Sequence, residues 1–355
     1  MRTSTALVSS LARRVASTVT TPLVPGDYLD MVAPLRAGGD LRGRVLEVVP
    51  ETPDAVTVVI RPSRGWAGHL PGQYVRIGVD VDGVRRWRAY SLTSESHRRD
   101  VISVTVKAIP DGVVSGHITR SLVPGTLLQL DQAVGEFTLG EHRGPTLFLT
   151  AGSGVTPVMG MLRNYLDELT DVVVVHSAPD ADAAIFGDEL RRLHEHGRIR
   201  LVERHTDTDG VLAPADLDAH VPDWDRREAW ACGPVAMLDD LEQHWAAAGV
   251  GPQLHTERFR PTVVAAGEGG TLSFTRSDAV VEADGATTLL DAGEAAGVLM
   301  PSGCRMGICF GCVAGLQEGT VRDLRNGEAT TATPDEEVRI QTCVSAAAGP
   351  CRIDL

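Results

Sequence analysis

The spacing of four cysteines in the last quarter of the chain constrains the fold more than any other feature of the sequence. Cys304, Cys309 and Cys312 follow one another as C-x4-C-x2-C, and Cys343 comes after a gap of 30 residues. Structural zinc usually takes paired C-x2-C knuckles, and only one such pair is present. The spacing fits instead a [2Fe–2S] cluster held by three cysteines in one loop and a distant fourth. We therefore predict an iron–sulfur cluster with these four cysteines as its metal ligands.

The residues around these cysteines are typical of a loop wrapped around a cluster. They are small or turn-forming, and glycine lets backbone N–H groups approach the sulfur atoms; the set is Pro301, Gly303, Gly307 and Gly311. Residues 271–355, with "SGCRMGICFGC" and "QTCVS", resemble the plant-type ferredoxin domain. The resemblance implies a β-grasp fold with a hairpin over 271–285 and a helix over 287–297. Cys351 competes as the fourth ligand, but Cys343 has the better spacing, so we expect Cys351 to be a buried strand residue.

The chain has 355 residues, which is enough for two or three domains. Residues 41–140 contain short Val- and Ile-rich runs separated by Pro, Gly and Asp, which predict an antiparallel β-barrel. From residue 146, buried-strand runs such as "TLFLT" and "DVVVVHS" alternate with helical segments such as "GVTPVMGMLRNYL". This alternation predicts a doubly wound parallel α/β sheet. The Gly-rich residues 262–270 predict a linker.

Four short motifs occur in a distinctive order along the chain. They are "PGQY" (71–74), "RAYS" (88–91), "GVVS" (112–115) and, within the α/β region, "ACGP" (231–234). Together they resemble the ferredoxin–NADP reductase superfamily over residues 40–260. With the ferredoxin-like part, the resemblance implies five segments: an N-terminal extension (1–38), an FAD-binding barrel (39–142), an NAD(P)-binding α/β domain (143–261), the linker (262–270) and the [2Fe–2S] domain (271–355).

The resemblance assigns FAD-binding roles to the motifs of the barrel, for which the alternative is a turn and a strand with ordinary packing. Arg88 would pair with the FAD pyrophosphate, because its guanidinium matches phosphate oxygens. Tyr90 would lie against the isoalloxazine or the ribityl chain. Ser91 would form a hydrogen bond near N5, the atom that accepts hydride, and we take Ser91 and Tyr90 as candidate catalytic residues. Further FAD contacts are expected from Ala89, Gly112, Val114 and Ser115.

A second group of residues is expected to bind the nicotinamide cofactor. The segment "GSGVTP" (152–157) is not G-x-G-x-x-G, because Pro157 takes the last position, but it resembles the superfamily's G-x-G-x-x-P form. Gly152 and Gly154 would let the backbone approach a pyrophosphate at the positive end of a helix. Thr156 is the predicted N-cap of that helix, with Pro157 at its first position.

The "CGP" and "ERF" segments complete the predicted site. The resemblance places Cys232, Gly233 and Pro234 on the nicotinamide side, with Cys232 as a candidate catalytic residue near the hydride path. The alternative for Cys232 is an ordinary buried core cysteine. Residues 257–259 ("ERF") would close over the flavin.

The choice between NADPH and NADH depends on the end of the second parallel strand. Ser177 stands there, where NADH-binding sites usually place an acidic residue for the ribose hydroxyl groups, and this favours NADPH. Asp180 and Asp182 would repel a 2′-phosphate, and the next arginine is Arg191. We predict NADPH, with NADH as the alternative.

The predicted cofactors imply a direction of electron flow toward a protein acceptor. FAD converts a hydride into single electrons, which a [2Fe–2S] cluster can carry. The segments 21–35 and 85–94 resemble actinobacterial reductases that serve membrane di-iron enzymes, among them stearoyl-CoA 9-desaturase and alkane hydroxylase. The predicted acceptor is therefore a fatty-acyl desaturase or an alkane or fatty-acid hydroxylase. The alternatives are a Rieske dioxygenase, a redox-sensing protein without turnover, and a zinc module on a flavodehydrogenase.

Composition excludes several other classes of protein. The net charge of −14 argues against nucleic-acid binding. Residues 262–355 carry 13 Asp and Glu against 6 Arg, which would suit a basic docking surface on the acceptor. We expect a monomer in the cytoplasm without a signal peptide or a membrane span. An apolar stripe near the N-terminus either packs on the protein's own body or docks on the inner face of a membrane or a membrane-bound partner; it comprises Leu7, Leu11, Val15 and Val19.

Overall fold

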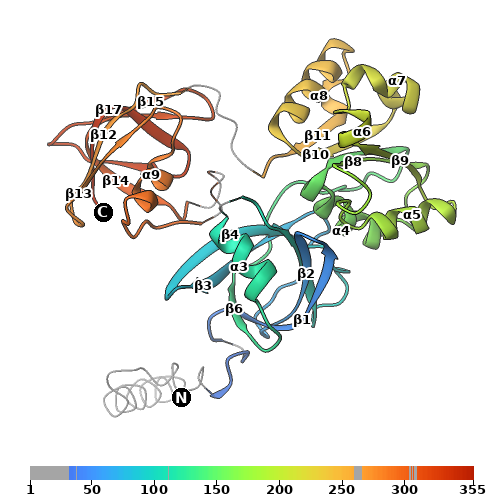
Figure 1. Cartoon of the computed structure of the whole chain (residues 1–355), viewed down its shortest axis with the longest axis horizontal. Coiled ribbons are helices and arrows are strands. Elements are labelled where there is room, and N and C mark those ends of the chain that lie inside the picture. Colours follow the sequence, from blue (N-terminus) through green and yellow to red (C-terminus); the bar gives the residue numbers. More distant parts are fainter. Residues whose placement is uncertain are drawn as a thin grey trace, which may run out of the picture.

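The computed structural model describes most of the chain from residue 32 onward. The described residues are 32–36, 38–110, 112–259, 266–303, 305, 307 and 310–355. The N-terminal stripe and the predicted ligands Cys304 and Cys309 lie outside them. Within this part of the chain, no helix combines the length and apolarity needed to cross a membrane. Figure 1 shows three bodies: an antiparallel sheet (blue to teal), a parallel sheet (green to yellow) and a C-terminal sheet (orange to red).

The first body is the predicted antiparallel barrel. Its strand order is β4-β3-β6-β1-β2-β5, with the bounds β1 (Arg42–Thr52), β2 (Ala55–Pro62), β3 (Tyr74–Val81), β4 (Val84–Ser91), β5 (Ile102–Lys107) and β6 (Leu127–Leu130). The two edge strands approach each other where Leu92 bridges Val104, and the N–H of Thr93 donates to the carbonyl of Ser103 at 2.9 Å. Valine and isoleucine side chains from all sides fill the interior. Helix α3 (Val113–Ser121) follows β5 directly.

The register of strand β4 is set by a two-residue turn. Asp82 and Gly83 have φ angles of 52° and 78°, as a type I′ hairpin requires, and Val81 pairs with Val84 across them. The pairing continues to Tyr74 opposite Ser91. Asp and Gly tolerate these left-handed conformations better than other residues do.

The second body is the predicted doubly wound parallel sheet, of order β11-β10-β7-β8-β9. Phe148 and Trp230 pack on one face against helices α4 and α5, whereas Leu147 and Leu149 pack on the other face against α7 and α8. The strands are β7 (Thr146–Ala151), β8 (Val172–Ala178), β9 (Arg200–His205), β10 (Glu228–Cys232) and β11 (Leu254–Glu257). The helices are α4 (Val155–Tyr165), α5 (Gly187–Glu195), α6 (Thr206–Asp209), α7 (Leu217–His220) and α8 (Val235–Ala247), with 3-10 turns η1 (Gly152–Gly154), η2 (Pro214–Asp216), η3 (Trp224–Arg226) and η4 (Gly251–Gln253).

The third body has the predicted hairpin and helix of the β-grasp fold. The strand order is β13-β12-β17-β14-β15, with β16 paired to β14. The bounds are β12 (Gly270–Phe274), β13 (Ala279–Ala283), α9 (Leu289–Ala295), β14 (Val313–Asp323), β15 (Ala329–Ala332), β16 (Val338–Gln341) and β17 (Ser345–Ile353). Thr288 caps α9, because its hydroxyl oxygen accepts from the N–H of Asp291 at 3.0 Å. A single apolar core joins the helix to the sheet.

Candidate functional site

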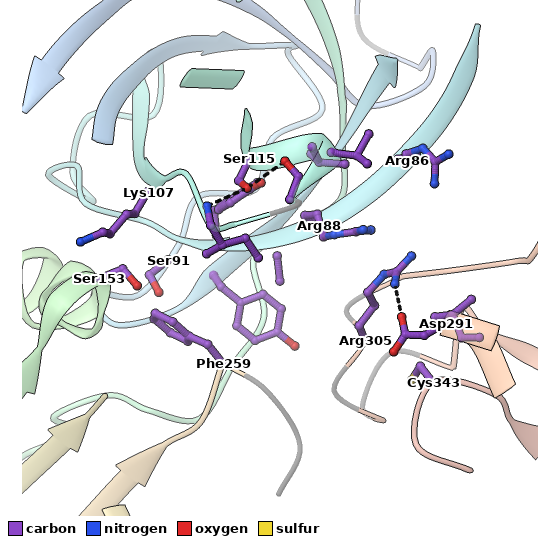
Figure 2. Close-up of a pocket in the computed structure, with 18 of the residues that line it drawn as sticks. Arg86, Arg88, Ser91, Lys107, Ser115, Ser153, Phe259, Asp291, Arg305 and Cys343 are labelled. Carbon is purple, nitrogen blue, oxygen red and sulfur yellow. Dashed lines mark hydrogen bonds and ion pairs between the residues drawn. The ribbon is translucent and has the colours of Figure 1, made fainter. Parts of the chain in front are cut away.

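One cavity of about 690 Å³ is lined by residues from all three bodies. Figure 2 shows Arg88, Ser91 and Ser115 on the barrel side, with Arg305 and Cys343 facing them from the C-terminal body. The predicted site residues that line the cavity are Arg88, Ala89, Tyr90, Ser91, Gly112, Val114, Ser115, Thr156 and Cys343. Those that do not line it are Gly152, Gly154, Pro157, Ser177, Cys232, Gly233, Pro234 and Cys312.

Strand β4 brings two polar side chains with unused hydrogen-bonding capacity to the cavity. Ser91 is 3% exposed, and its Oγ has no hydrogen-bond partner among the described residues. Arg88 is half-buried, and one of its nitrogens donates to the carbonyl of Trp87 at 2.8 Å. Burial and the nearby charge of Arg305 lower the pKa of Arg88 to about 10. A buried arginine with donors to spare and an orphaned hydroxyl fit an anionic, hydrogen-bonding cofactor.

The N-terminus of helix α3 forms the adjacent wall. Gly112 is its N-cap residue, no side chain caps it, and its first turn contains no acidic residue. The Oγ of Ser115 turns back, donating to the carbonyl of Gly112 at 3.3 Å and accepting from the N–H of Ile109 at 3.3 Å. The first N–H groups of a helix have no partner within the helix, so this end can hold a phosphate. Together with Arg88, it fits the pyrophosphate of FAD.

The Gly-rich turn after β7 differs from the prediction in one respect. Helix α4 begins at Val155 with Gly154 as its N-cap residue, so the prediction of Thr156 as N-cap and Pro157 as first residue is wrong. The 3-10 turn of Gly152–Gly154 already winds the chain into the helix, and the Thr156 hydroxyl donates back to the Ser153 carbonyl at 2.9 Å. Gly152 has a left-handed φ of 53°. No side chain caps α4, so its first turn also fits an anion.

The close packing of the turn after β7 against the loop after β10 leaves no room for a side chain at Gly154. A Cβ at this position would lie 2.0 Å from the carbonyl oxygen of Cys232. The turn after β7 and the "CGP" loop after β10 are therefore in direct backbone contact. Cys232 itself is 0% exposed and packs in the core of the parallel sheet, behind the cavity.

Glu257 lines the cavity as the first residue of the "ERF" segment, but the sequence did not indicate that its carboxyl would be protonated. It pairs with Cys232 across β10 and β11, at the carboxyl end of the parallel sheet, where ligands of such sheets bind. The residue is half-buried, but its Oε2 is enclosed and has no hydrogen-bond partner in the described part of the chain. Burial raises the pKa of the Glu257 carboxyl to about 8. At neutral pH the group therefore carries a proton and can donate a hydrogen bond into the cavity.

The predicted nicotinamide-specificity region shows an arginine that is already paired. Ser177 lies in the last two residues of β8 and is buried. Arg191 on α5 donates to both carboxylate oxygens of Glu203, at 2.7 and 2.9 Å, and to Asp188 at 3.1 Å. Its charge is compensated by these two carboxylates, which makes Arg191 a poor ligand for a 2′-phosphate.

The two predicted cluster ligands that the structure describes belong to the buried core of the C-terminal body. Cys312 and Cys343 are buried, and the Thr342 hydroxyl donates to the carbonyl of Cys312 at 2.9 Å. Two further side chains bind the loop between the first ligands, because Arg325 and Gln341 donate to the carbonyl of Gly307 at 3.0 and 2.9 Å.

Arg325 also supplies positive charge to the cluster site. Its pKa is raised by its hydrogen bonds to Asp323 and further by the negative charge of Cys343 and Cys312. A cation beside two thiolates fits a negatively charged iron–sulfur centre. Spacing alone did not point to Arg325 or Gln341, because neither belongs to the cysteine pattern.

Cys351 is the buried strand residue that we expected. It lies in β17 opposite Gly319, and its thiol donates to the carbonyl of Thr320 at 3.1 Å. Cys351 therefore pairs with the middle of β14, whereas Cys312 directly precedes the first residue of that strand.

Comparisons with known proteins agree with these three parts. Family models described as oxidoreductase FAD-binding domain, oxidoreductase NAD-binding domain and 2Fe-2S iron-sulfur cluster binding domain match residues 60–139, 148–243 and 274–348. The cofactors are therefore FAD, NAD(P)H and a [2Fe–2S] cluster, as predicted, and the zinc alternative is set aside.

Three curated relatives match over most of their length. The NADPH oxidoreductase of Mycobacterium tuberculosis is 47% identical over 352 residues, which cover 97% of this chain and 92% of the relative. The NADH oxidoreductase HCR of Escherichia coli is 34% identical, covering 76% of this chain and 84% of the relative. The ferredoxin reductase component of 3-ketosteroid-9-alpha-monooxygenase of Mycolicibacterium smegmatis is 30% identical, covering 78% of this chain and 86% of the relative.

The raised pKa of Glu257 predicts a pH dependence of stability. Between about pH 4.5 and 8 the folded protein keeps a proton that the unfolded chain releases, so the free energy of unfolding falls as pH rises through this window. The loss amounts to about 1.4 kcal/mol for each pKa unit. Glu257→Gln stays neutral, so the drop in Tm of the FAD-loaded protein between pH 5 and pH 8.5 should become smaller. Glu47→Gln, an exposed carboxyl on β1, is the control and should keep the wild-type drop. An unchanged drop in Glu257→Gln would contradict the raised pKa.

Proposed function

The chain belongs to the branch of the ferredoxin–NADP reductase superfamily that carries a C-terminal 2Fe-2S domain, and on that basis we propose that it delivers electrons from NADPH to an oxygen-activating enzyme. The observation that carries the proposal is the shared cavity, which Ser91, Thr156 and Cys343 line from three different bodies. When bound, FAD accepts a hydride and gives up electrons one at a time, and the [2Fe–2S] cluster passes them on.

We assign FAD binding to the groups that have free hydrogen-bonding capacity in the barrel. Arg88 and the uncapped end of α3, with Gly112, Val114 and Ser115, hold the pyrophosphate. Ala89 and Tyr90 contact the flavin from the cavity wall, and Phe259 covers it from the end of β11. The Oγ of Ser91 is the hydrogen-bonding group at the hydride-accepting atom.

We assign the nicotinamide cofactor to the edge of the parallel sheet. The turn at Gly152 and Gly154 and the first turn of α4, with Thr156 and Pro157, bind its pyrophosphate, and Gly233 and Pro234 border the nicotinamide. Glu257 and Cys232 lie side by side at this edge, and both are uncharged at neutral pH, because burial raises the pKa of each. The uncharged Glu257 carboxyl would line the cavity beside the transferred hydride, and Cys232 would pack in the core of the parallel sheet next to it.

We assign cluster binding to Cys304, Cys309, Cys312 and Cys343, with Arg325 and Gln341 fixing the loop through the Gly307 carbonyl. Cys343 lines the cavity, so one cluster ligand faces the flavin site directly. One predicted cluster ligand therefore lines the same cavity as the proposed flavin site, an arrangement that suits one-electron transfer.

As acceptor we propose a membrane di-iron enzyme, namely a fatty-acyl desaturase or an alkane or fatty-acid hydroxylase. The resemblance of residues 21–35 and 85–94 supports this choice, and the acidic C-terminal body suits a basic docking surface. The alternative is the reductase component of a Rieske-type oxygenase. The 30%-identical ferredoxin reductase component of 3-ketosteroid-9-alpha-monooxygenase supports an oxygenase as the acceptor, which leaves this alternative open.

Two substitutions in β4 should separate hydride transfer from FAD binding. Ser91→Ala should keep FAD yet slow flavin reduction on the order of ten- to a thousandfold, because it removes a hydrogen bond at the reacting atom. Arg88→Ala should instead weaken FAD binding about ten- to a hundredfold, because phosphate charge loses a charge-assisted partner. Arg85→Ala is the matched control, since Arg85 is exposed and pairs with Asp80. Stopped-flow reduction of Ser91→Ala at the wild-type rate would exclude Ser91 from the site.

The end of β8 should decide the nicotinamide preference. We expect a higher kcat/KM with NADPH than with NADH, as the name of the 47%-identical NADPH oxidoreductase also suggests. Ser177→Asp should reverse the preference about tenfold, because a carboxylate accepts from the ribose hydroxyl groups and repels a 2′-phosphate. Ser177→Asn is the uncharged control. A wild-type preference for NADH would show that the acidic residues Asp180 and Asp182 determine specificity.

Loss of the cluster should abolish delivery to the acceptor but not hydride transfer. Cys309→Ser should lose its iron, still reduce ferricyanide with NADPH, and fail to drive a di-iron desaturase or hydroxylase. Cys351→Ser is the matched control, because its hydroxyl can still donate to the Thr320 carbonyl and it should keep the iron. If Cys309→Ser drives the oxygenase at the normal rate, electrons leave the flavin directly. A wild-type protein that reduces only a Rieske-type oxygenase would select the alternative acceptor.

A further inference from the structure

Among the described residues, an ion pair of the Glu294 carboxylate connects the [2Fe–2S] body to the FAD-binding barrel. Glu294 lies on α9, and its Oε1 accepts a hydrogen bond from Nη2 of Arg305. The same oxygen lies 3.9 Å from Nη1 of Arg86 on strand β4. The Arg86 and Glu294 side chains are 30% and 21% exposed, so the contact between the two bodies is partly shielded from solvent.

One of the two arginines, Arg86, lies on the proposed FAD-binding strand, and the other, Arg305, lies in the predicted cluster loop. Arg86 stands two residues before Arg88 on the same strand, and the period of two puts both on one face. Arg305 follows the predicted ligand Cys304 directly in the sequence. Figure 2 shows Arg86 and Arg88 on the barrel side of the cavity, and Arg305 across from them beside Asp291. Glu294 therefore joins the cluster loop to the FAD-binding strand.

The charges around Glu294 would otherwise push the two bodies apart. Beyond the effect of burial, the positive charge of Arg305 lowers the pKa of Arg88, and the positive charge of Arg86 lowers it further. The negative charge of Glu294 raises the pKa of Arg88 and so opposes the effect of both arginines. With Glu294 neutral, the ion pair with Arg86 would be lost, and Arg305, still paired with Asp291, would face two like charges on β4, so the contact between the two bodies would weaken.

We propose that Glu294 is a positioning residue that holds the [2Fe–2S] body against strand β4, so that Cys343 stays at the flavin cavity. The proposal rests on the electron path inferred above, but it concerns the relative position of two bodies, which can be measured without any acceptor. Distance matters here because one-electron transfer between fixed centres falls steeply as their separation grows.

The chain supplies a control that separates this role from local support of the cluster loop. Asp291 lies on the same helix and accepts from Nη1 of Arg305 at 2.8 Å. Within the described residues, the ion pairs of Asp291 stay inside the C-terminal body, whereas those of Glu294 reach β4. If Glu294 acted only by fixing Arg305, Asp291→Asn and Glu294→Gln would have the same effect. A positioning role predicts an effect of Glu294→Gln alone.

The decisive experiment reverses the charges across the contact in the full-length, cofactor-loaded protein. Glu294→Arg and Arg86→Glu each create repulsion, so each should enlarge the radius of gyration in small-angle X-ray scattering. Each should also slow cluster reduction, relative to flavin reduction, about two- to fivefold, the factor that the free energy of one partly exposed ion pair corresponds to. The double variant restores opposite charges and should recover both values at least in part. Arg85→Glu, next to Arg86 but paired with Asp80 within the barrel, should match the wild type.

The outcomes separate this inference from the proposed function. Single variants with wild-type dimensions would overturn the positioning role, and so would a double variant no better than the worse single one. If NADPH fails to reduce the cluster in the wild-type protein, the electron path is wrong. In that case the scattering data still decide whether Glu294 holds the two bodies together. Iron content, measured for every variant, identifies a loss of the cluster itself.

Discussion

The register of strand β4 is the constraint on which the site depends. The turn at Asp82 and Gly83 pairs Val81 with Val84, and every later residue of the strand follows from that pairing. Side chains alternate between the two faces of a strand, so a slip of one residue would turn Arg86 and Arg88 away from the cavity. The proposed pyrophosphate ligand, Arg88, and the contact of Arg86 with the [2Fe–2S] body would be lost together. One hairpin therefore fixes both the cofactor site and the place where the C-terminal body can attach.

Sequence reasoning succeeded where the chemistry itself dictates the spacing of residues. Four thiolates can surround two irons only if the chain returns to them at particular intervals, so the cysteine pattern pointed to the cluster, and the 2Fe-2S family match agrees. The alternation of buried strands and amphipathic helices likewise predicted the parallel sheet, because each helix must cover one face of it. Arg88 and Ser91 were found through a motif, and the structure brings both to one cavity.

The remaining site residues depend on contacts that no local pattern records. Glu257 is an ordinary carboxylate in the sequence, and its raised pKa arises only because β11 pairs with β10 and encloses it. Arg325 reaches the cluster loop through the carbonyl of Gly307, a backbone group with no sequence signature. The start of α4 was misplaced because a 3-10 turn at Gly152–Gly154 precedes the helix and takes over the capping role expected of Thr156.

The charge distribution around the cavity links FAD binding to the arrangement of the bodies. The chain carries a net charge of −14, yet Arg86, Arg88 and Arg305 gather at this one place with Glu294 between them. The pyrophosphate that we propose on Arg88 would add negative charge to the same group and reduce the repulsion that Arg305 meets from β4. FAD and Glu294 therefore act in the same direction. In the proposed arrangement, the bound cofactor would therefore strengthen the contact that brings Cys343 to it, and it would do so most where Glu294 is neutral.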